Sequence, residues 1–396
     1  MRVVVVGAGP AGMAAARTAA DAGAEVTMVD SEPEAGGQYL RGRAKFSHDK
    51  VTHLKNTEAW LVENQTLHLR GHSPLTFDAL VLATGAYDRP LPFPGWDGPG
   101  VITAGAAQAL AKQGVTLAER VIVSGSGPFL LPVATALQDL GATIVGVYEA
   151  SSPMRWLRET RAIAANRHKI GELASYRKVL RHLETRTAVI AKHGSKVTVA
   201  KLDGQWRPTS HRTEHADLVC VGYGFLPRTD LVPEAARTND FLDVDERQRT
   251  SVPNVYAAGE VTGIGGADLS EAEGIVAGAA AAGHQPPPQA LKAVRNGRLF
   301  AEALTRAHAI HPGWQTWPNE DTTVCRCEKV QLKDLAPAVT MRELKLTSRV
   351  ALGRCQGRIC ARNAADLTGV PFDGQRRVIA IPIPLGELAE LPEEQS

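Results

Sequence analysis

Residues 2–30 have the sequence RVVVVGAGPAGMAAARTAADAGAEVTMVD. This stretch predicts a buried apolar strand, a glycine-rich turn, an Ala-rich helix and a second strand that ends at Asp30. Together these elements form the opening βαβ unit of a Rossmann fold. In such a unit Gly7 permits the tight turn, Gly9 lets the backbone approach a pyrophosphate, and Gly12 allows the helix to pack closely on the strand.

The chemistry that this unit predicts is dinucleotide binding. The N-terminus of the helix would face the negative phosphates, and Asp30 would accept hydrogen bonds from the ribose of an adenosine. A glycine-rich turn in an unrelated α/β fold is the alternative, but here strand, turn, helix and acid fall in register. We therefore predict that the following residues bind FAD: Gly7, Gly9, Pro10, Ala11, Gly12, Asp30 and Ser31.

The same pattern recurs at residues 119–150, with the sequence ERVIVSGSGPFLLPVATALQDLGATIVGVYEA. The spacing from Gly7 to Asp30 is 23 positions, and the spacing from Gly125 to Glu149 is 24. The chain is therefore expected to contain two nucleotide-binding units in tandem.

The second unit departs from the pattern of the first. Leu130 replaces the third glycine, and Pro132 lies in the first turns of the predicted helix. Two interpretations stay open: an NAD-like site formed by Gly125, Gly127 and Glu149, or a degenerate site that binds only another adenine nucleotide. If a nicotinamide cofactor binds, Glu149 favours NAD over NADP, because a 2′-phosphate would meet a carboxylate.

Composition narrows the classes of function. The chain has 396 residues, 44% of them hydrophobic, which is enough for two or three domain cores. The formal net charge of +2 lacks the basic excess of a nucleic-acid-binding protein. No stretch resembles a membrane-spanning helix, and glycines interrupt the N-terminal valines before a signal-peptide core could form. We expect a cytoplasmic protein without nucleic acid as a partner.

Four of the five cysteines lie in the last quarter of the chain, as Cys325-x-Cys327 and, after 27 intervening residues, Cys355-x4-Cys360. In a reducing compartment, paired cysteines are more often metal ligands or redox centres than disulfides. The four thiolates suit a [2Fe-2S] cluster, with structural zinc or uncommitted surface thiols as alternatives. The fifth, Cys220, lies in an apolar strand and is expected to be buried and inert.

The pattern of breaks predicts the domain organisation. The segment GHQPPPQ at 283–289 interrupts regular structure, and residues 290–310 then predict an amphipathic helix. We expect an FAD-binding domain at 1–103 and 221–285, an NAD-like nucleotide-binding domain at 104–220, a helical linker at 286–318 and a [2Fe-2S]-binding domain with the C-terminal tail at 319–396. The predicted fold class is α/β, with two Rossmann-like domains of the glutathione-reductase-like type and a small α-rich C-terminal domain.

Residues 1 to about 283 resemble the flavoproteins with two dinucleotide-binding domains, which include glutathione and thioredoxin reductases. The resemblance rests on the first βαβ unit and on EPEAGGQY (32–39), ALVLATGAYDRP (79–90), ADLVCVGYGFLPRTDL (216–231) and VPNVYAAGEVTG (252–263). It implies further FAD-binding residues: Gly37, Gln38, Ala83, Thr84, Gly85, Gly259, Glu260, Gly265, Gly266 and Ala267. The last three would open a helix whose N-terminus points at the flavin ring.

Almost the whole chain resembles a narrower family, the FAD-containing electron-transfer subunits of heteromeric amine and amino-acid dehydrogenases. The motifs LATGAYDRPLPFPGW, GVITAGAAQAL, AAGEVTGIGGADLSEAEG, VCRCE, GRCQGRIC and IPIPLGELA carry this resemblance. The C-terminal part resembles the [2Fe-2S] module of bacterioferritin-associated ferredoxin, but its second pair is Cys-x4-Cys where the simplest form has Cys-x2-Cys.

The family resemblance implies a division of labour. A partner subunit of the D-amino-acid-oxidase type would oxidise the amine, and this chain would carry the electrons. FMN at the subunit interface and a small ferredoxin-like subunit are further components that the resemblance allows. The alternative is a stand-alone NADH-dependent flavin and iron–sulfur reductase. No catalytic residue for amine oxidation can be named, and residues 89–96 (RPLPFPGW) predict either an exposed docking segment or a rigid linker.

Overall fold

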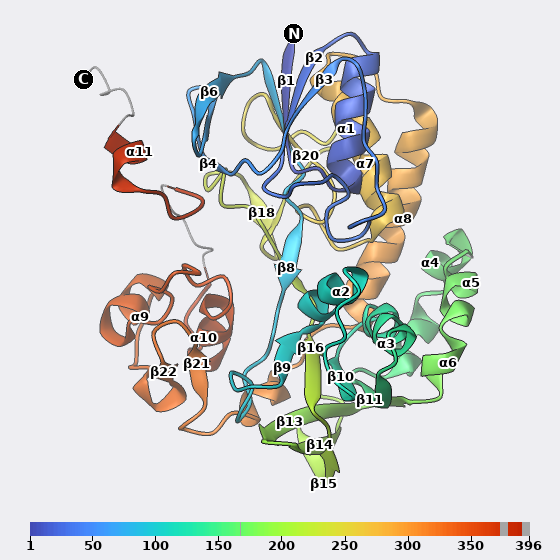
Figure 1. The fold of residues 1–396 in the computed structure, drawn as a ribbon, viewed down its shortest axis with the longest axis vertical. Helices are drawn as coiled ribbons and strands as arrows, with labels where there is room; N and C mark the ends of the chain where they lie inside the picture. Colours follow the sequence, from blue (N-terminus) through green and yellow to red (C-terminus); the bar gives the residue numbers. More distant parts are fainter. Residues whose placement is uncertain (167, 373–378, 390–396) are drawn as a thin grey trace. The chain divides into compact units, whose positions relative to one another are not determined.

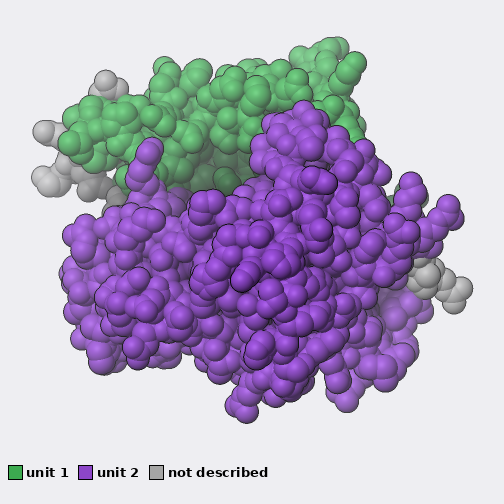
Figure 2. Space-filling model, turned by 60° about the horizontal axis from the view of Figure 1, so that its bottom comes forward, with its two compact units in different colours: residues 1–87, 226–301, 375–396 green, residues 88–225, 302–374 purple. Residues whose placement is uncertain are grey.

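The structure is a computed structural model that describes residues 1–166, 168–372 and 379–389 (Figure 1). The chain divides into two compact units (Figure 2). Unit 1 contains residues 1–87, 226–301 and the described part of the C-terminus after 375. Unit 2 contains residues 88–225 and the described part of 302–374.

Unit 1 is built on a five-stranded parallel sheet with the strand order β20-β7-β1-β2-β3 (Figure 1). Its strands are β1 (Arg2–Val6), β2 (Glu25–Val29), β3 (Val51–Leu54), β7 (Ala79–Leu82) and β20 (Val255–Ala257). Alternate side chains of β1 enter different cores, since Val3 and Val5 belong to one hydrophobic cluster and Val4 to another. The continuous valine run is therefore a strand buried on both faces.

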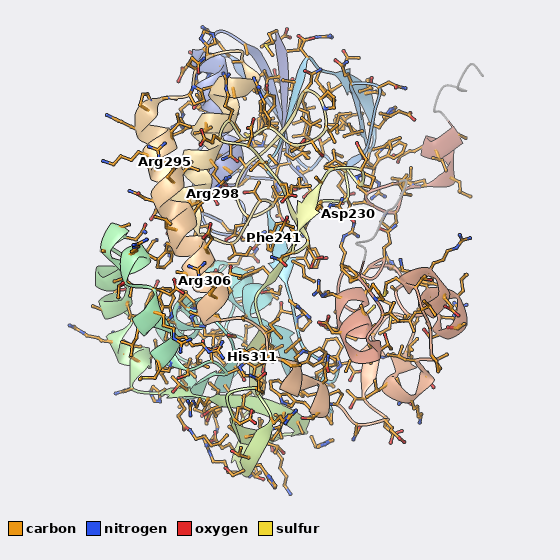
Figure 3. The ribbon with its side chains drawn as sticks, turned by 180° about the vertical axis from the view of Figure 1, so that it is seen from behind. Asp230, Phe241, Arg295, Arg298, Arg306 and His311 are labelled. Atoms are coloured by element: carbon orange, nitrogen blue, oxygen red, sulfur yellow. The ribbon has the colours of Figure 1, made fainter. Side chains whose placement is uncertain are left out.

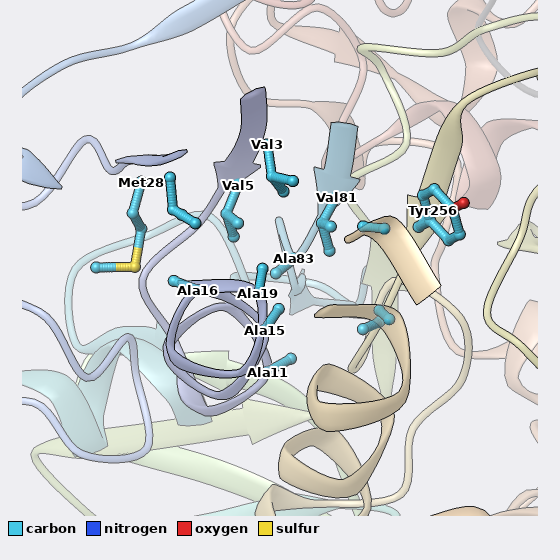
Figure 4. Close-up of a cluster of buried hydrophobic side chains, with 14 of the residues drawn as sticks. Val3, Val5, Ala11, Ala15, Ala16, Ala19, Met28, Val81, Ala83 and Tyr256 are labelled. Carbon is cyan, nitrogen blue, oxygen red and sulfur yellow. The ribbon is translucent and has the colours of Figure 1, made fainter. Parts of the chain in front are cut away.

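Two helices of small residues, α1 (Pro10–Asp21) and α7 (Ala267–Ala281), pack against each other in unit 1. A Cβ on Gly274 would lie 2.2 Å from the carbonyl oxygen of Ala11, and one on Gly278 would lie 2.3 Å from that of Ala15. Figure 4 shows Ala16 and Ala19 on the side of α1 toward the sheet residue Val5, and Ala11 on the side toward the neighbouring helix. The predicted helix after the first glycine turn is therefore confirmed, and so is the predicted helix that opens at Ala267.

The rest of unit 1 consists of smaller elements. They are the antiparallel strands β4 (Ala59–Glu63), β5 (Thr66–Leu69) and β6 (His72–Thr76), the hairpin β18 (Arg237–Thr238) and β19 (Phe241–Leu242), and the short helix α11 (Leu385–Ala389). Leu67 and Leu69 of β5 join the core cluster that also contains Val4.

Unit 2 repeats the parallel arrangement with the strand order β12-β11-β10-β16-β9. Its strands are β9 (Val101–Thr103), β10 (Arg120–Gly125), β11 (Thr143–Glu149), β12 (Leu183–Thr185) and β16 (Leu218–Gly222), with an antiparallel sheet of β13 (Thr187–His193), β14 (Lys196–Leu202) and β15 (Pro208–His215). Its helices are α2 (Ala104–Lys112), α3 (Leu130–Asp139), η1 (Pro153–Arg158), α4 (Thr160–Ala165), α5 (His168–Ser175) and α6 (Arg177–Leu180).

Among the residues that the structure describes, the chain passes between the units within three elements, β8 (Ala86–Asp88), β17 (Phe225–Pro227) and α8 (Pro288–Ala307). The predicted amphipathic helix at 290–310 is confirmed as α8. The boundaries predicted for the four domains are not tested by these elements and stay predictions.

The last part of unit 2 is a small thiol-containing module with its own hydrophobic core. It contains η2 (Pro312–Thr316), the hairpin β21 (Thr323–Cys325) and β22 (Val330–Gln331), η3 (Leu332–Asp334), α9 (Met341–Ser348) and α10 (Ala361–Thr368). Val324, Leu344 and Ala364 lie in its core together with the thiols of Cys325 and Cys360.

Residues 89–96 are buried, so the prediction of an exposed docking segment is wrong. Leu91 and Phe93 have no exposed surface and lie in a core cluster of unit 2. Arg89 pairs with Asp366 of α10, and the indole N–H of Trp96 donates to the carbonyl oxygen of Thr323 at 2.5 Å. The apolar side chains and the two polar contacts anchor the thiol module to the rest of unit 2.

Candidate cofactor sites

The first glycine loop has no room for side chains at two of its three glycines. Gly7 has φ +106°, and a Cβ there would lie 2.2 Å from the carbonyl oxygen of Ala83. A Cβ on Gly12 would lie 1.8 Å from the carbonyl oxygen of Gly7. Beside Gly9 the space is open, because a Cβ there would meet no atom within 4 Å. This cradle fits the approach of a phosphate to the backbone.

Other segments that the sequence assigned to FAD meet at this loop. The N–H of Gly36 donates to the carbonyl oxygen of Ala8 at 2.7 Å, and a Cβ on Gly37 would lie 2.9 Å from Cα of Gly9. A Cβ on Gly259 would lie 2.9 Å from that of Ala11. The loops at 36–37, at 83–85 and at 259 therefore surround one turn, although far apart in sequence.

Asp30 lies at the end of β2 with its side chain partly exposed. One carboxylate oxygen accepts the N–H of Ala8 at 2.5 Å, and the other accepts the N–H of Glu32 at 2.7 Å. Each carboxylate oxygen can accept a second hydrogen bond, so Asp30 can bind a ribose hydroxyl as well. The neighbouring Ser31 is exposed.

Glu260 and the start of α7 lie on the remaining side of this region. Burial raises the pKa of the Glu260 carboxyl to about 7. Helix α7 begins after Gly266, which has φ +83° and provides no side chain to cap the helix. The residue that precedes α7 thus provides no side-chain cap for the first N–H groups of the helix. That these residues bind FAD stays a prediction.

Glu273 of α7 is a functional candidate that the sequence analysis missed. Its side chain is 1% exposed, and one oxygen accepts the N–H of Gly259 at 2.9 Å and the hydroxyl of Thr262 at 3.0 Å. The other oxygen pairs with Nε of Arg298 at 3.1 Å, and Arg298, which is labelled on α8 in Figure 3, also donates to Gln248. The sequence could have indicated this residue, because Glu273 is an acid within an apolar Ala/Gly-rich helix. A charge buried in such a helix needs a partner.

The second glycine loop has the same constraint at its first glycine. A Cβ on Gly125 would lie 1.8 Å from the carbonyl oxygen of Gly222. Helix α3 begins only at Leu130, whose side chain is buried in the core of unit 2. Glu149 is buried and accepts the N–H of Gly127 at 2.7 Å. The structure brings the three predicted residues together, and their role in binding a nucleotide stays a prediction.

The four thiols of the C-terminal module contact one another. The thiol of Cys360 hydrogen-bonds to Cys325 and to Cys355, and the thiol of Cys327 hydrogen-bonds to Cys355. Cys325 ends β21 and Cys360 precedes α10, so the hairpin and the helix bring the two sequence pairs together. A Cβ on Gly353 would lie 2.2 Å from that of Cys327, which explains the glycine between the pairs.

The hydrogen bonds link the four thiols in the order Cys327, Cys355, Cys360 and Cys325. Within residues 1–166, 168–372 and 379–389, no three His, Cys, Asp or Glu side chains are grouped so that they could hold a metal ion. A tetrahedral zinc site needs four donors around one ion, whereas a [2Fe-2S] cluster takes four thiolates at two irons. Four thiolates are a donor set that suits either kind of site, and the binding of a [2Fe-2S] cluster by these cysteines stays a prediction.

Hydrogen bonding favours the ionised form of two of the four thiols, whereas the pKa of Cys327 and that of Cys360 are raised. The hydrogen bond from Cys360 lowers the pKa of Cys325 to about 6, and it also lowers the pKa of Cys355. Cys360, the donor in both bonds, has a raised pKa. Cys220, by contrast, is fully buried in β16, where burial raises its pKa, so the predicted burial of this thiol is confirmed.

The comparisons with known proteins agree with this architecture. The pattern of the pyridine nucleotide-disulphide oxidoreductase family matches residues 1–297. The chain belongs to this family. It is therefore an oxidoreductase of the α/β FAD- and NAD-binding fold, and the predicted fold class is confirmed. Membership of this family supports the binding of flavin and nicotinamide nucleotides.

Two relatives match nearly the whole chain. An opine oxidase subunit of Agrobacterium tumefaciens is 30% identical over 98% of this chain and 92% of its own length. Hydrogen cyanide synthase subunit HcnB of Pseudomonas protegens is 29% identical over 92% of this chain and 91% of its own length. Both relatives are subunits of larger enzymes.

Among solved structures, L-proline dehydrogenase from P. horikoshii shares the fold, with a TM-score of 0.69 and 19% identity. The match covers 98% of this chain and 79% of that chain. In the part of this chain that the structure describes, no helix is long and apolar enough to cross a membrane.

Proposed function

We propose that this chain is the electron-transfer flavoprotein subunit of a heteromeric amine or amino-acid dehydrogenase. The observation that carries the proposal is the near full-length similarity to two proteins that are themselves subunits, one of opine oxidase and one of hydrogen cyanide synthase. In this proposal a partner of the D-amino-acid-oxidase type oxidises a CH–NH bond of a substrate such as proline, hydroxyproline, glycine or an opine.

FAD is the cofactor proposed for unit 1. The open space beside Gly9 would admit the pyrophosphate, Asp30 would accept from the adenosine ribose, and the N-terminus of α7 at Ala267 would stabilise negative charge on the flavin. Bound FAD can accept two electrons and release them singly, which suits a position between a two-electron donor and a one-electron carrier. The buried Glu273 would hold the Gly259 backbone in place beside this site.

A [2Fe-2S] cluster bound by Cys325, Cys327, Cys355 and Cys360 is the proposed one-electron carrier. The proposal is supported by the mutual contacts of the four thiols and by the lowered pKa of Cys325 and Cys355, because the thiolate is the form that binds metal. FMN at the interface with the catalytic subunit, together with a small ferredoxin-like subunit, would complete the assembly. We expect the complex to act in the cytoplasm.

The experiment is to purify the chain alone and together with the product of the neighbouring gene that encodes its partner. Dye reduction would be assayed with proline, hydroxyproline, glycine and opines. We expect turnover only by the complex, and about two irons per chain in anaerobically purified protein. Robust turnover by the isolated chain would refute the division of labour, and zinc in place of iron in protein from iron-replete cells would refute the cluster.

A further inference from the structure

The acid of the second nucleotide fold is covered by the protein itself. Glu149, at the end of β11, is only 8% exposed. One of its oxygens accepts the N–H of Ser151 at 2.8 Å, and the other accepts the N–H of Gly127 at 2.7 Å. A bound dinucleotide would need this carboxylate for its ribose hydroxyls.

His308, which follows α8, lies against this carboxylate. Its Nδ1 is 3.4 Å from Oε2 of Glu149. Its carbonyl oxygen accepts the hydroxyl of Ser126 at 3.4 Å, and the hydroxyls of Ser126 and Ser151 lie 3.1 Å apart. The histidine, the two serines and the glycine loop thus enclose the carboxylate.

Two further contacts hold this segment in place. The indole N–H of Trp156 donates to Nε2 of His308 at 3.1 Å, so in the neutral ring the hydrogen is on Nδ1, which faces Glu149. Arg306, which is labelled near the end of α8 in Figure 3, makes two hydrogen bonds to the carboxylate of Glu159, at 3.0 and 2.8 Å. We call residues 306–308 the latch.

The obstruction lies at the ribose end of the fold. Beside Gly127 the space is open, as it is beside Gly9, because a Cβ at either glycine would meet no atom within 4 Å. Helix α3, however, begins at Leu130, three residues after Gly127, whereas α1 begins directly after Gly9. The second fold thus also lacks a helix N-terminus immediately at its middle glycine.

We propose that the latch closes the ribose end of the second nucleotide fold, so that this chain does not accept NAD or NADH. His308 takes the position against Glu149 that a ribose would occupy, and the residues of this fold do not fit the nicotinamide nucleotide that the family as a whole uses. Electrons then reach the protein by a route other than NADH. This inference can fail without affecting the assignment of FAD or of the cluster.

The test measures binding of NADH and of ADP-ribose to the full-length, cofactor-loaded protein by equilibrium dialysis. We expect no saturation of the wild type up to about 1 mM, which corresponds to a binding free energy weaker than about −4 kcal/mol. His308→Ala and Trp156→Ala should each bind at least about tenfold more tightly. Adding Glu149→Gln to His308→Ala should remove the gain, because the ribose then loses its carboxylate.

The matched control is His311→Ala. His311 packs on the ring of Trp206 at 5.8 Å and has no contact with Glu149 among those described, so its loss should not increase binding. Stoichiometric binding of NADH to the wild type with a dissociation constant below about 0.1 mM would overturn the proposal. Equal, unmeasurable binding by the wild type and both latch variants would overturn the role assigned to His308.

Discussion

The two glycine loops of this chain have the same constraint at their first glycine and differ at their third position. Gly7 and Gly125 are both required, since a Cβ at either position would collide with a carbonyl oxygen of the adjacent strand end, at 2.2 and 1.8 Å. At the third position the first loop has Gly12 and the second has Leu130. Sequence repetition therefore preserves the strand-to-turn geometry, and it does not by itself preserve a nucleotide site.

The acids that end the second strand of each nucleotide fold, Asp30 and Glu149, differ in their exposure. Both acids accept two backbone N–H groups, but Asp30 is partly exposed, whereas Glu149 is buried and has His308 against it. The first loop is an open cradle, and the second belongs to the internal structure of unit 2. Four substitutions and one redox experiment test this contrast.

The largest effect should come from making the first loop resemble the second. Gly12→Leu would place a side chain whose first atom lies 1.8 Å from the carbonyl oxygen of Gly7, so α1 could not keep its position. We expect colourless protein and a loss of about 4 kcal/mol or more of unfolding free energy. Flavin content and denaturant unfolding measure both effects.

Gly204→Ala is the control for this substitution, because a Cβ at Gly204 would meet no atom within 4 Å. A Gly12→Leu protein that keeps stoichiometric FAD would show that close packing at this position is not needed.

The buried ion pair beside the first loop should give the next effect. Glu273→Ala would leave the Arg298 guanidinium without its carboxylate and the N–H of Gly259 without its acceptor. We expect a loss of about 3–5 kcal/mol of unfolding free energy and weaker retention of FAD. Chemical denaturation and flavin release measure these changes. Glu302→Ala, in an exposed ion pair with Arg306, is the control, and an equally small effect of both substitutions would contradict the account.

A substitution at the third position of the second loop tests whether Leu130 prevents nucleotide binding there. Leu130→Ala removes a buried side chain and should cost about 2–5 kcal/mol of unfolding free energy. It should not create NADH binding, because the latch at His308 remains. Thermal unfolding and equilibrium dialysis measure the two outcomes. A gain of NADH affinity in this variant would place the obstruction at Leu130, where the account places it at Glu149.

The raised pKa of Glu260 predicts a smaller, pH-dependent effect on the unfolding free energy. Burial raises the pKa of the Glu260 carboxyl from the ordinary 4.5 to about 7. The folded state therefore favours the protonated carboxyl, and the stability that this group contributes is fully present below pH 4.5 and is lost as the pH rises through about 7. Relative to Glu260→Gln, the cofactor-free wild type should therefore lose up to about 3 kcal/mol across this window. Urea denaturation at pH 5 and pH 8 measures the difference. An unchanged difference between the two proteins at both pH values would refute the raised pKa.

Local patterns predicted much of this molecule. The glycine turn, α1, the repeat around Gly125, the helix at 290–310 and the buried Cys220 follow from residue spacing and hydrophobicity, which act over short stretches of chain. The four cysteines could be paired as a donor set from spacing alone, and their thiols indeed contact one another.

The missed features depend on contacts between distant segments. His308 reaches Glu149 across more than 150 positions, and Arg89 reaches Asp366 across 277. The exposure predicted for residues 89–96 was wrong because proline and aromatic residues suit a buried anchor as well as a surface. Glu273 was missed because its partner Arg298 lies 25 positions later in the sequence.

The most direct test of the central claim is an anaerobic reduction experiment with the purified complex. Amine substrate added to the complex should bleach the flavin and generate the paramagnetic signal of a reduced [2Fe-2S] cluster, which Cys325→Ser should abolish while Cys220→Ser leaves it unchanged. NADH added to the isolated chain should do neither, because the latch covers Glu149 at the ribose end of the second nucleotide fold. Stoichiometric bleaching of the flavin by NADH in the isolated chain, together with a substrate-insensitive cluster in the complex, would contradict the account.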